Sequence, residues 1–261
     1  MLGAIIGDVV GSRYEFNNIK IKDFELVGKG CYFTDDTVMS IAVDEIMING
    51  WQNDRDRIIQ TLKKWGQKYP HAGYGSKFRY WVLSNDPRPY YSCGNGSAMR
   101  VSAAGWFANS EAEAKQNARA VTEVTHNHPE GLKGAYVTAL CIYYARNGYT
   151  KEQIKAYVEK YYKLDFTYEE LVKTYEHGPE ICQETVPQAV WCFLNSDSFE
   201  DCLRTTISIG GDCDTTAAIS CAIAEAYYGL DESIARLVLP YLSKDIIEIL
   251  KKIPLYNDLL K

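Results

Sequence analysis

The chain has 261 residues, of which 46% are hydrophobic and 24% are charged. This is ordinary globular composition, and we expect a single domain over residues 1–261 with one large core. The formal net charge of −6 argues against a protein whose main task is to neutralise a nucleic-acid backbone, because that task needs a basic face.

The amino-terminal segment and the cysteines bear on where the protein works. No basic segment precedes the apolar run at residues 1–7, and Asp8 follows it, so the run does not resemble a signal peptide. No apolar run approaches the roughly 20 residues that span a bilayer. The eight cysteines form no C-x-x-C pair and lie mostly in apolar stretches, which is typical of reduced core thiols. We therefore expect a cytoplasmic monomer with no membrane segment.

Helical periodicity dominates the first third of the chain. Apolar residues recur at spacings of three and four over 36–49, and again over 54–69, where Pro70 ends the run. The stretch 70–97 shows no such regularity, and an irregular segment of that length in a compact domain is usually functional. It ends in a glycine-rich turn that predicts a further helix from about Ser97.

Helix signals continue through the rest of the chain. Three pairs have the spacing of a capping box, in which side chain and backbone satisfy each other at the start of a helix: Ser110 with Glu113, Thr150 with Gln153, and Thr167 with Glu170. Pro129 fits the first position of a helix that ends near Arg146. The run 214–228 is small or apolar on all sides, which predicts a central helix. Because strand signals are few, the sequence predicts an all-α fold of more than eight helices.

Two short acidic segments carry the clearest chemistry. Residues 34–36, Thr-Asp-Asp, stand at the start of the 36–49 helix, where simple capping could account for them. Residues 212–215, Asp-Cys-Asp-Thr, enter the most apolar helix of the chain after two glycines. Unpaired carboxylates at a buried helix start cost several kcal/mol each, so a positive partner is needed. Four carboxylates and two hydroxyls form an all-oxygen set that suits two magnesium or manganese ions better than zinc.

Three further groups are candidates for the same site. Glu15 follows glycines that permit close backbone approach, although from this segment alone a surface glutamate is the more common interpretation. The turn Cys-Gly-Asn-Gly-Ser at 93–97 could present N–H groups to a phosphate, although such turns are often structural. His126 precedes the helix that begins at Pro129 and could hold a phosphate or hydroxyl, or could simply pack in the core.

Five segments, taken together and in this order, resemble the ADP-ribosylglycohydrolase family over nearly the whole chain. They are GDVVGSRYE (7–15), FTDDT (33–37), GNGSAMR (94–100), THNHPEG (125–131) and GGDCDTTAAISCAIAEAYYG (210–229). The resemblance implies a compact orthogonal bundle of many helices, in agreement with the helical pattern. Cys213 and Cys221 depart from the small residues common in the family, and we expect neither to affect ligation.

The resemblance also implies roles for individual residues. The ligands of a binuclear magnesium or manganese centre would be Thr34, Asp35, Asp36, Asp212, Asp214 and Thr215. Glu15, with Asp36 and Asp212, would take part in catalysis. The ADP-ribose pocket would be lined by Ser92, Gly94, Asn95, Gly96, Ser97 and His126. Tyr90 and Tyr91 could stack on the adenine.

The expected function is metal-dependent hydrolysis at C1 of the distal ribose, releasing ADP-ribose from an ADP-ribosylated protein or a small ADP-ribose conjugate. Nucleic acid enters only as a modified substrate. Two alternatives stay open: a catalytically silent ADP-ribose-binding or structural protein of the same fold, and a metal-dependent phosphohydrolase of nucleotide diphosphates. The acceptor group and the choice between magnesium and manganese are open as well.

Overall fold

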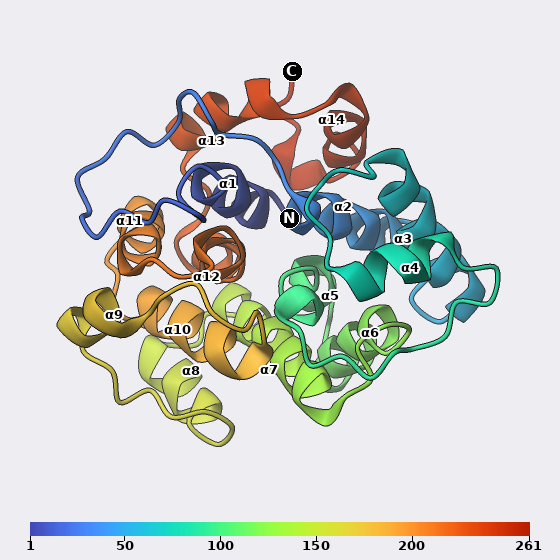
Figure 1. The fold of residues 1–261 in the computed structure, drawn as a ribbon, viewed down its shortest axis with the longest axis horizontal. Coiled ribbons are helices and arrows are strands. Elements are labelled where there is room, and N and C mark those ends of the chain that lie inside the picture. The colour runs from blue at the N-terminus through green and yellow to red at the C-terminus, as the bar shows by residue number, and fades with distance from the viewer.

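The computed structural model describes residues 1–261 and contains helices and connecting segments but no strand, so the all-α prediction is confirmed. The helices run in several directions around a buried centre (Figure 1). The α-helices are α1 Leu2–Gly11, α2 Asp35–Ile48, α3 Arg55–Lys68, α4 Ser76–Leu83, α5 Ser102–Trp106, α6 Glu111–Thr122, α7 Pro129–Arg146, α8 Lys151–Val158, α9 Tyr168–Thr174, α10 Cys182–Leu194, α11 Phe199–Ile209, α12 Cys213–Tyr228, α13 Glu232–Val238 and α14 Lys244–Leu250. Three short 3-10 helices, η1 Asn95–Ser97, η2 Leu239–Tyr241 and η3 Pro254–Tyr256, complete the list.

The helix α12 lies at the centre of the molecule. It packs against α1, α7, α10 and α11, and its residues 213–225 are all buried. This matches the prediction of a central helix from the run 214–228. Because α12 is enclosed in this way, the side chains at its amino terminus are carried into the interior of the protein.

The first helix, which the sequence analysis did not predict, lies directly against α12. Gly3, Gly7 and Gly11 share one face of α1. A Cβ atom at Gly7 would lie 2.2 Å from the carbonyl oxygen of Ala217, and one at Gly11 would lie 2.4 Å from the Cα of Asp214. Only glycine allows this approach. The glycines of α1 lower its helix propensity, but they let its backbone lie against that of α12.

Most predicted helix boundaries agree with the structure to within a residue or two. This holds for α2, α3, α7 and α12. Thr150 and Thr167 form reciprocal capping boxes with Gln153 and Glu170. The pair at α6 is different: the Ser110 hydroxyl accepts from Glu113 N–H, but the Glu113 carboxylate accepts from Asn109 N–H, one residue earlier than a capping box requires.

The stretch 70–97 was wrongly predicted to be irregular throughout. It contains α4, whose side chains Phe78, Trp81 and Val82 are buried in the core. The helix predicted from Ser97 is also wrong, because η1 ends there and α5 begins only at Ser102. At this break the Arg100 side-chain Nε–H donates to the Gly96 carbonyl, which a continuous helix would use for a main-chain hydrogen bond.

The cysteines and the apolar character of the helices can now be compared with the predictions. All eight cysteines are free, and every one except Cys93 is buried, in agreement with their interpretation as core thiols. No helix combines the length and the apolar character that crossing a membrane would require.

Candidate active site

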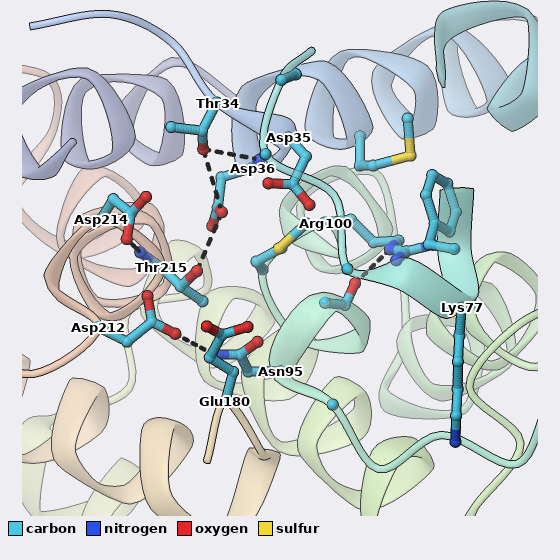
Figure 2. A pocket seen from close by; sticks show the side chains of 18 of the residues that line it. Thr34, Asp35, Asp36, Lys77, Asn95, Arg100, Glu180, Asp212, Asp214 and Thr215 are labelled. Carbon is cyan, nitrogen blue, oxygen red and sulfur yellow. Dashed lines mark hydrogen bonds between the residues drawn. The ribbon is translucent and has the colours of Figure 1, made fainter. Parts of the chain in front are cut away.

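The two acidic segments meet in space. Residues 34–36 lie at the amino terminus of α2, and residues 212–215 lie at the amino terminus of α12. The Thr215 hydroxyl donates a hydrogen bond of 3.0 Å to Asp36 Oδ2, which joins the two segments directly (Figure 2). The prediction that these distant segments form one cluster is therefore confirmed.

Asp8, which the sequence analysis did not single out, fixes the α2 side of the cluster. Its fully buried carboxylate accepts from Thr34 N–H at 2.9 Å, from the Thr34 hydroxyl at 2.8 Å and from Thr37 N–H at 3.0 Å. The Thr37 hydroxyl donates to it as well. Burial raises the pKa of Asp8 to about 6, although these hydrogen bonds act in the opposite direction. Since α1 also touches the start of α12, this one helix aligns both acidic segments.

The protein supplies no cation to the acidic groups of this cluster. No lysine or arginine lies within 4.0 Å of the carboxylates at positions 35, 36, 212 and 214. Asp36 is 3% exposed, and its Oδ1 is buried without any hydrogen-bond partner. Burial and the charge of Asp8 raise the pKa of Asp35 to about 8. Burial and neighbouring carboxylates raise the pKa values of Asp36 and Asp214 well above the usual value.

Glu15 lies at the same cluster rather than on the open surface. One of its carboxylate oxygens lies within 4.8 Å of an oxygen of Asp212 and of Asp214. Its side chain is only 15% exposed, and burial and the charge of Asp212 raise its pKa. His177 Nε2 lies 3.5 Å from Glu15 Oε1 and 3.8 Å from Glu180 Oε1. His177 and Glu180 follow α9 in an irregular segment, and no sequence pattern pointed to them.

A cavity of about 420 Å³ extends from the acidic cluster to the glycine-rich turn. All six predicted metal ligands and Glu15 line it, as do Ser92, Gly94, Asn95, Gly96 and His126. Asn95 joins its two ends, because its amide nitrogen donates to Asp212 Oδ2 at 2.5 Å and to the Thr185 hydroxyl at 3.0 Å. Asn95 N–H also donates to the Glu180 carbonyl at 2.9 Å, which places Glu180 beside the cluster.

His126 is buried at the turn end of the cavity. Its Nδ1 lies 2.7 Å from the Thr125 hydroxyl oxygen, while its Nε2 faces the two glycines of the turn. Burial and the nearby Arg100 guanidinium lower its pKa well below the usual value, so the imidazole is neutral. A neutral ring can serve either as donor or as acceptor to a ligand hydroxyl or phosphate oxygen.

Two residues expected at the ligand lie elsewhere. Ser97 is fully buried beneath the turn, where its hydroxyl donates to the Gly94 carbonyl at 3.0 Å and contacts Cys182 Sγ at the same distance. It therefore supports the turn instead of lining the cavity. Tyr91 is 62% exposed and packs edge-on against His128, outside the cavity, whereas Tyr90 lines it.

Known proteins resemble this chain over most of its length. The family model described as ADP-ribosylglycohydrolase matches residues 1–256. The human protein "ADP-ribosylhydrolase ARH3" is 26% identical over 310 residues, covering 89% of this chain and 85% of its own. "ADP-ribosylarginine hydrolase Tri1" of Serratia proteamaculans is 25% identical and covers 88% and 70%. "ADP-ribosyl-[dinitrogen reductase] glycohydrolase" of Rhodospirillum rubrum is 26% identical and covers 88% and 85%.

A solved structure shares the fold. It is titled "ADP-ribosylglycohydrolase-related protein complex" and matches with a TM-score of 0.68 at 22% identity, over 99% of this chain and 95% of that one. At this identity the likeness concerns the fold, and the family assignment rests on the sequence match over nearly the whole chain. The chain belongs to the ADP-ribosylglycohydrolase family.

Proposed function

We propose that this protein is a metal-dependent hydrolase that cleaves the glycosidic bond at C1 of the distal ribose of ADP-ribose conjugates and releases ADP-ribose. One observation carries the proposal: carboxylates from α2 and α12 share one buried place without a protein cation. The names of the relatives describe hydrolysis of ADP-ribosylated targets, including ADP-ribosylarginine. The substrate would be an ADP-ribosylated protein or a small ADP-ribose conjugate.

The donor set fits two divalent cations. The ligands would be Thr34, Asp35, Asp36, Asp212, Asp214 and Thr215, all of which offer oxygen and suit magnesium or manganese. Asp36 Oδ1 supports this fit, since a buried carboxylate oxygen without a partner calls for a cation. Two divalent ions would balance the four negative charges. When bound, they would supply Lewis-acid and template chemistry.

The chain's own residues supply the remaining requirements. Hydrolysis of a glycosidic bond passes through an oxocarbenium-like state and needs a carboxylate that can move a proton. Glu15 fits this role because it lines the cavity beside Asp212 and Asp214 while keeping some access to solvent. Asn95 holds the turn against Asp212, so the ligand's two ends are bound at a set separation. His126 and the turn would bind the diphosphate and proximal ribose.

A substrate panel tests the proposal. We expect free ADP-ribose to be released from at least one of ADP-ribosylated arginine, ADP-ribosylated serine, an ADP-ribosylated nucleic-acid end and O-acetyl-ADP-ribose, with magnesium or manganese present. Excess EDTA should abolish the release, and activity that survives EDTA contradicts the metal-dependent scheme. AMP and ribose phosphate as products would favour the phosphohydrolase. Tight ADP-ribose binding without turnover on any substrate would identify a silent binding protein.

A further inference from the structure

Arg100 is a charged group in an unusual place. Its side chain is 2% exposed, yet it lines the cavity at the turn end, away from Asp212 and Asp214 (Figure 2). Its Nε donates to the Gly96 carbonyl, and its Nη1 donates to the Thr125 hydroxyl at 3.4 Å. No carboxylate lies within 4.0 Å of the guanidinium, and Nη2 donates to no protein acceptor.

A buried guanidinium without a counter-charge is costly to keep. It stays protonated in proteins, so it cannot relieve its burial by losing a proton. Buried charges are normally paired, because an unpaired one loses its hydration without compensation. The free Nη2 therefore leaves a charge-assisted hydrogen bond available to an anion that enters the cavity.

Arg100 Nη2 and His126 Nε2 converge on one point beside Gly96. A Cβ atom at Gly96 would lie 3.3 Å from Arg100 Nη2 and 3.3 Å from His126 Nε2. A Cβ atom at Gly94 would lie 3.5 Å from the same His126 nitrogen. Glycine at position 96 thus keeps an atom-sized gap between the guanidinium and the imidazole, a point from which one oxygen atom could reach both nitrogens.

We propose that Arg100 binds an oxygen of the ligand's diphosphate through Nη2, in the space bounded by Gly96 and His126. The identity of the ligand as an ADP-ribose compound rests on the proposed function. The cavity is then bipolar, with carboxylates at one end and a guanidinium at the other. This polarity sets the direction in which the ligand lies, and it requires a phosphorylated ligand rather than a bare nucleoside.

A purely structural role for Arg100 predicts different behaviour. In that case the hydrogen bond from Nε to the Gly96 carbonyl is what matters, because it shapes the turn. Arg100→Lys and Arg100→Met both lack this Nε–H, so they should weaken ligand binding equally. If the charge matters, Arg100→Lys should retain much of the affinity that Arg100→Met loses.

Calorimetric titration of ADP-ribose into the wild-type protein and both variants tests the proposal. We expect Arg100→Met to weaken binding by about 10- to 100-fold, as for loss of a charge-assisted hydrogen bond, and Arg100→Lys to weaken it by less than about 10-fold. Arg119→Met, which removes an exposed charge on α6, is the control and should change affinity less than about twofold. Equal losses in the Lys and Met variants, or no loss in either, overturn the proposal.

Gly96→Ala tests the same space while keeping the arginine at position 100. The added methyl would contact Nη2 and the imidazole, and the backbone at this position needs no left-handed conformation. Circular dichroism and the melting temperature should match the wild type while ADP-ribose affinity falls at least about 10-fold; unchanged affinity counts against the proposal even if Arg100→Met fails to fold.

Inorganic pyrophosphate separates this proposal from the proposed function. Suppose that the wild-type protein binds pyrophosphate, that Arg100→Met binds it more weakly, and that the wild type does not bind ADP-ribose. This result would contradict the proposed function but not the anion-binding role of Arg100. Wild-type protein that binds ADP-ribose with no dependence on Arg100 would sink only the role of Arg100.

Discussion

The two ends of the cavity are built in different ways. At the acidic end, side chains project from the amino termini of α2 and α12, and Asp8 and the α1 glycines hold those helices in place. At the other end, an irregular turn presents main-chain groups, a neutral imidazole and one guanidinium. The first end gathers acidic groups without a protein cation, and the second holds one guanidinium without a carboxylate in salt-bridge contact. This difference suits ligand groups of opposite charge, the proposed cations at the first end and the proposed diphosphate at the second.

Removing a carboxylate from the acidic end should have the largest effect on activity. We expect Asp36→Ala or Asp212→Ala to reduce kcat by at least about 1,000-fold, since each would remove a ligand of the proposed centre. The melting temperature of the metal-free variants should stay close to that of the wild type despite the large loss in kcat. The reason is that each change also relieves repulsion among buried carboxylates. Asp258→Ala, which removes an exposed carboxylate near the end of the chain, is the matched control. Substantial activity in Asp36→Ala would place the chemistry elsewhere.

Glu15 lies beside the acidic end without belonging to the proposed ligand set. Glu15→Gln keeps the shape of the side chain but cannot accept a proton, so we expect kcat to fall by about 100- to 10,000-fold. ADP-ribose affinity should change far less, because the phosphates are proposed to bind at the turn end. Parallel kinetic and calorimetric measurements check this split. An unchanged kcat would remove Glu15 from proton transfer.

The alignment of the acidic end depends on the contact of α1 with α12. In Gly7→Ala the new Cβ would lie 2.2 Å from a main-chain oxygen of α12, so the helices must separate. We expect a loss of about 2 to 4 kcal/mol in the free energy of unfolding and a melting temperature lower by about 5 to 10 °C. Gly75→Ala meets no atom within 4 Å and serves as the control. A Gly7→Ala variant as stable as Gly75→Ala would contradict the close packing.

The stability of the metal-free protein should depend on pH through the carboxyl groups of the acidic end. The pKa values of Asp8 and Asp35 rise to about 6 and about 8 in the folded protein, above the usual value of 3.8. Between about pH 4 and pH 8 the folded state therefore holds protons that the unfolded chain releases, so stability falls as pH rises through this window. In EDTA we expect a melting temperature a few degrees lower at pH 8 than at pH 5. Added manganese should remove the difference; a difference that persists would argue against cation binding here.

Most of the helices could be predicted from the sequence, because the residue patterns that mark a helix are local. Capping residues, proline at the first turn and apolar spacing depend on neighbours within one or two turns, which is why α2, α3, α7 and α12 were predicted nearly to the residue. The short helix α4 was missed because eight residues within a glycine- and proline-rich stretch give too little pattern. The helix predicted from Ser97 was wrong because the chain forms only a 3-10 turn over Asn95–Ser97, whose main-chain and side-chain groups bond to Glu180, Thr185 and Asp212, all distant in sequence.

The sequence by itself determined which oxygen-bearing residues this protein can offer a ligand, since the two acidic segments and the glycine turn are visible as motifs. Only the tertiary structure decided that Asp8, Arg100, His177 and Glu180 stand among them and that Ser97 does not face the cavity. The physical reason is that charge balance and burial are set by residues far apart in the chain. A carboxylate or guanidinium acquires its role from what surrounds it after α1, α2 and α12 have packed.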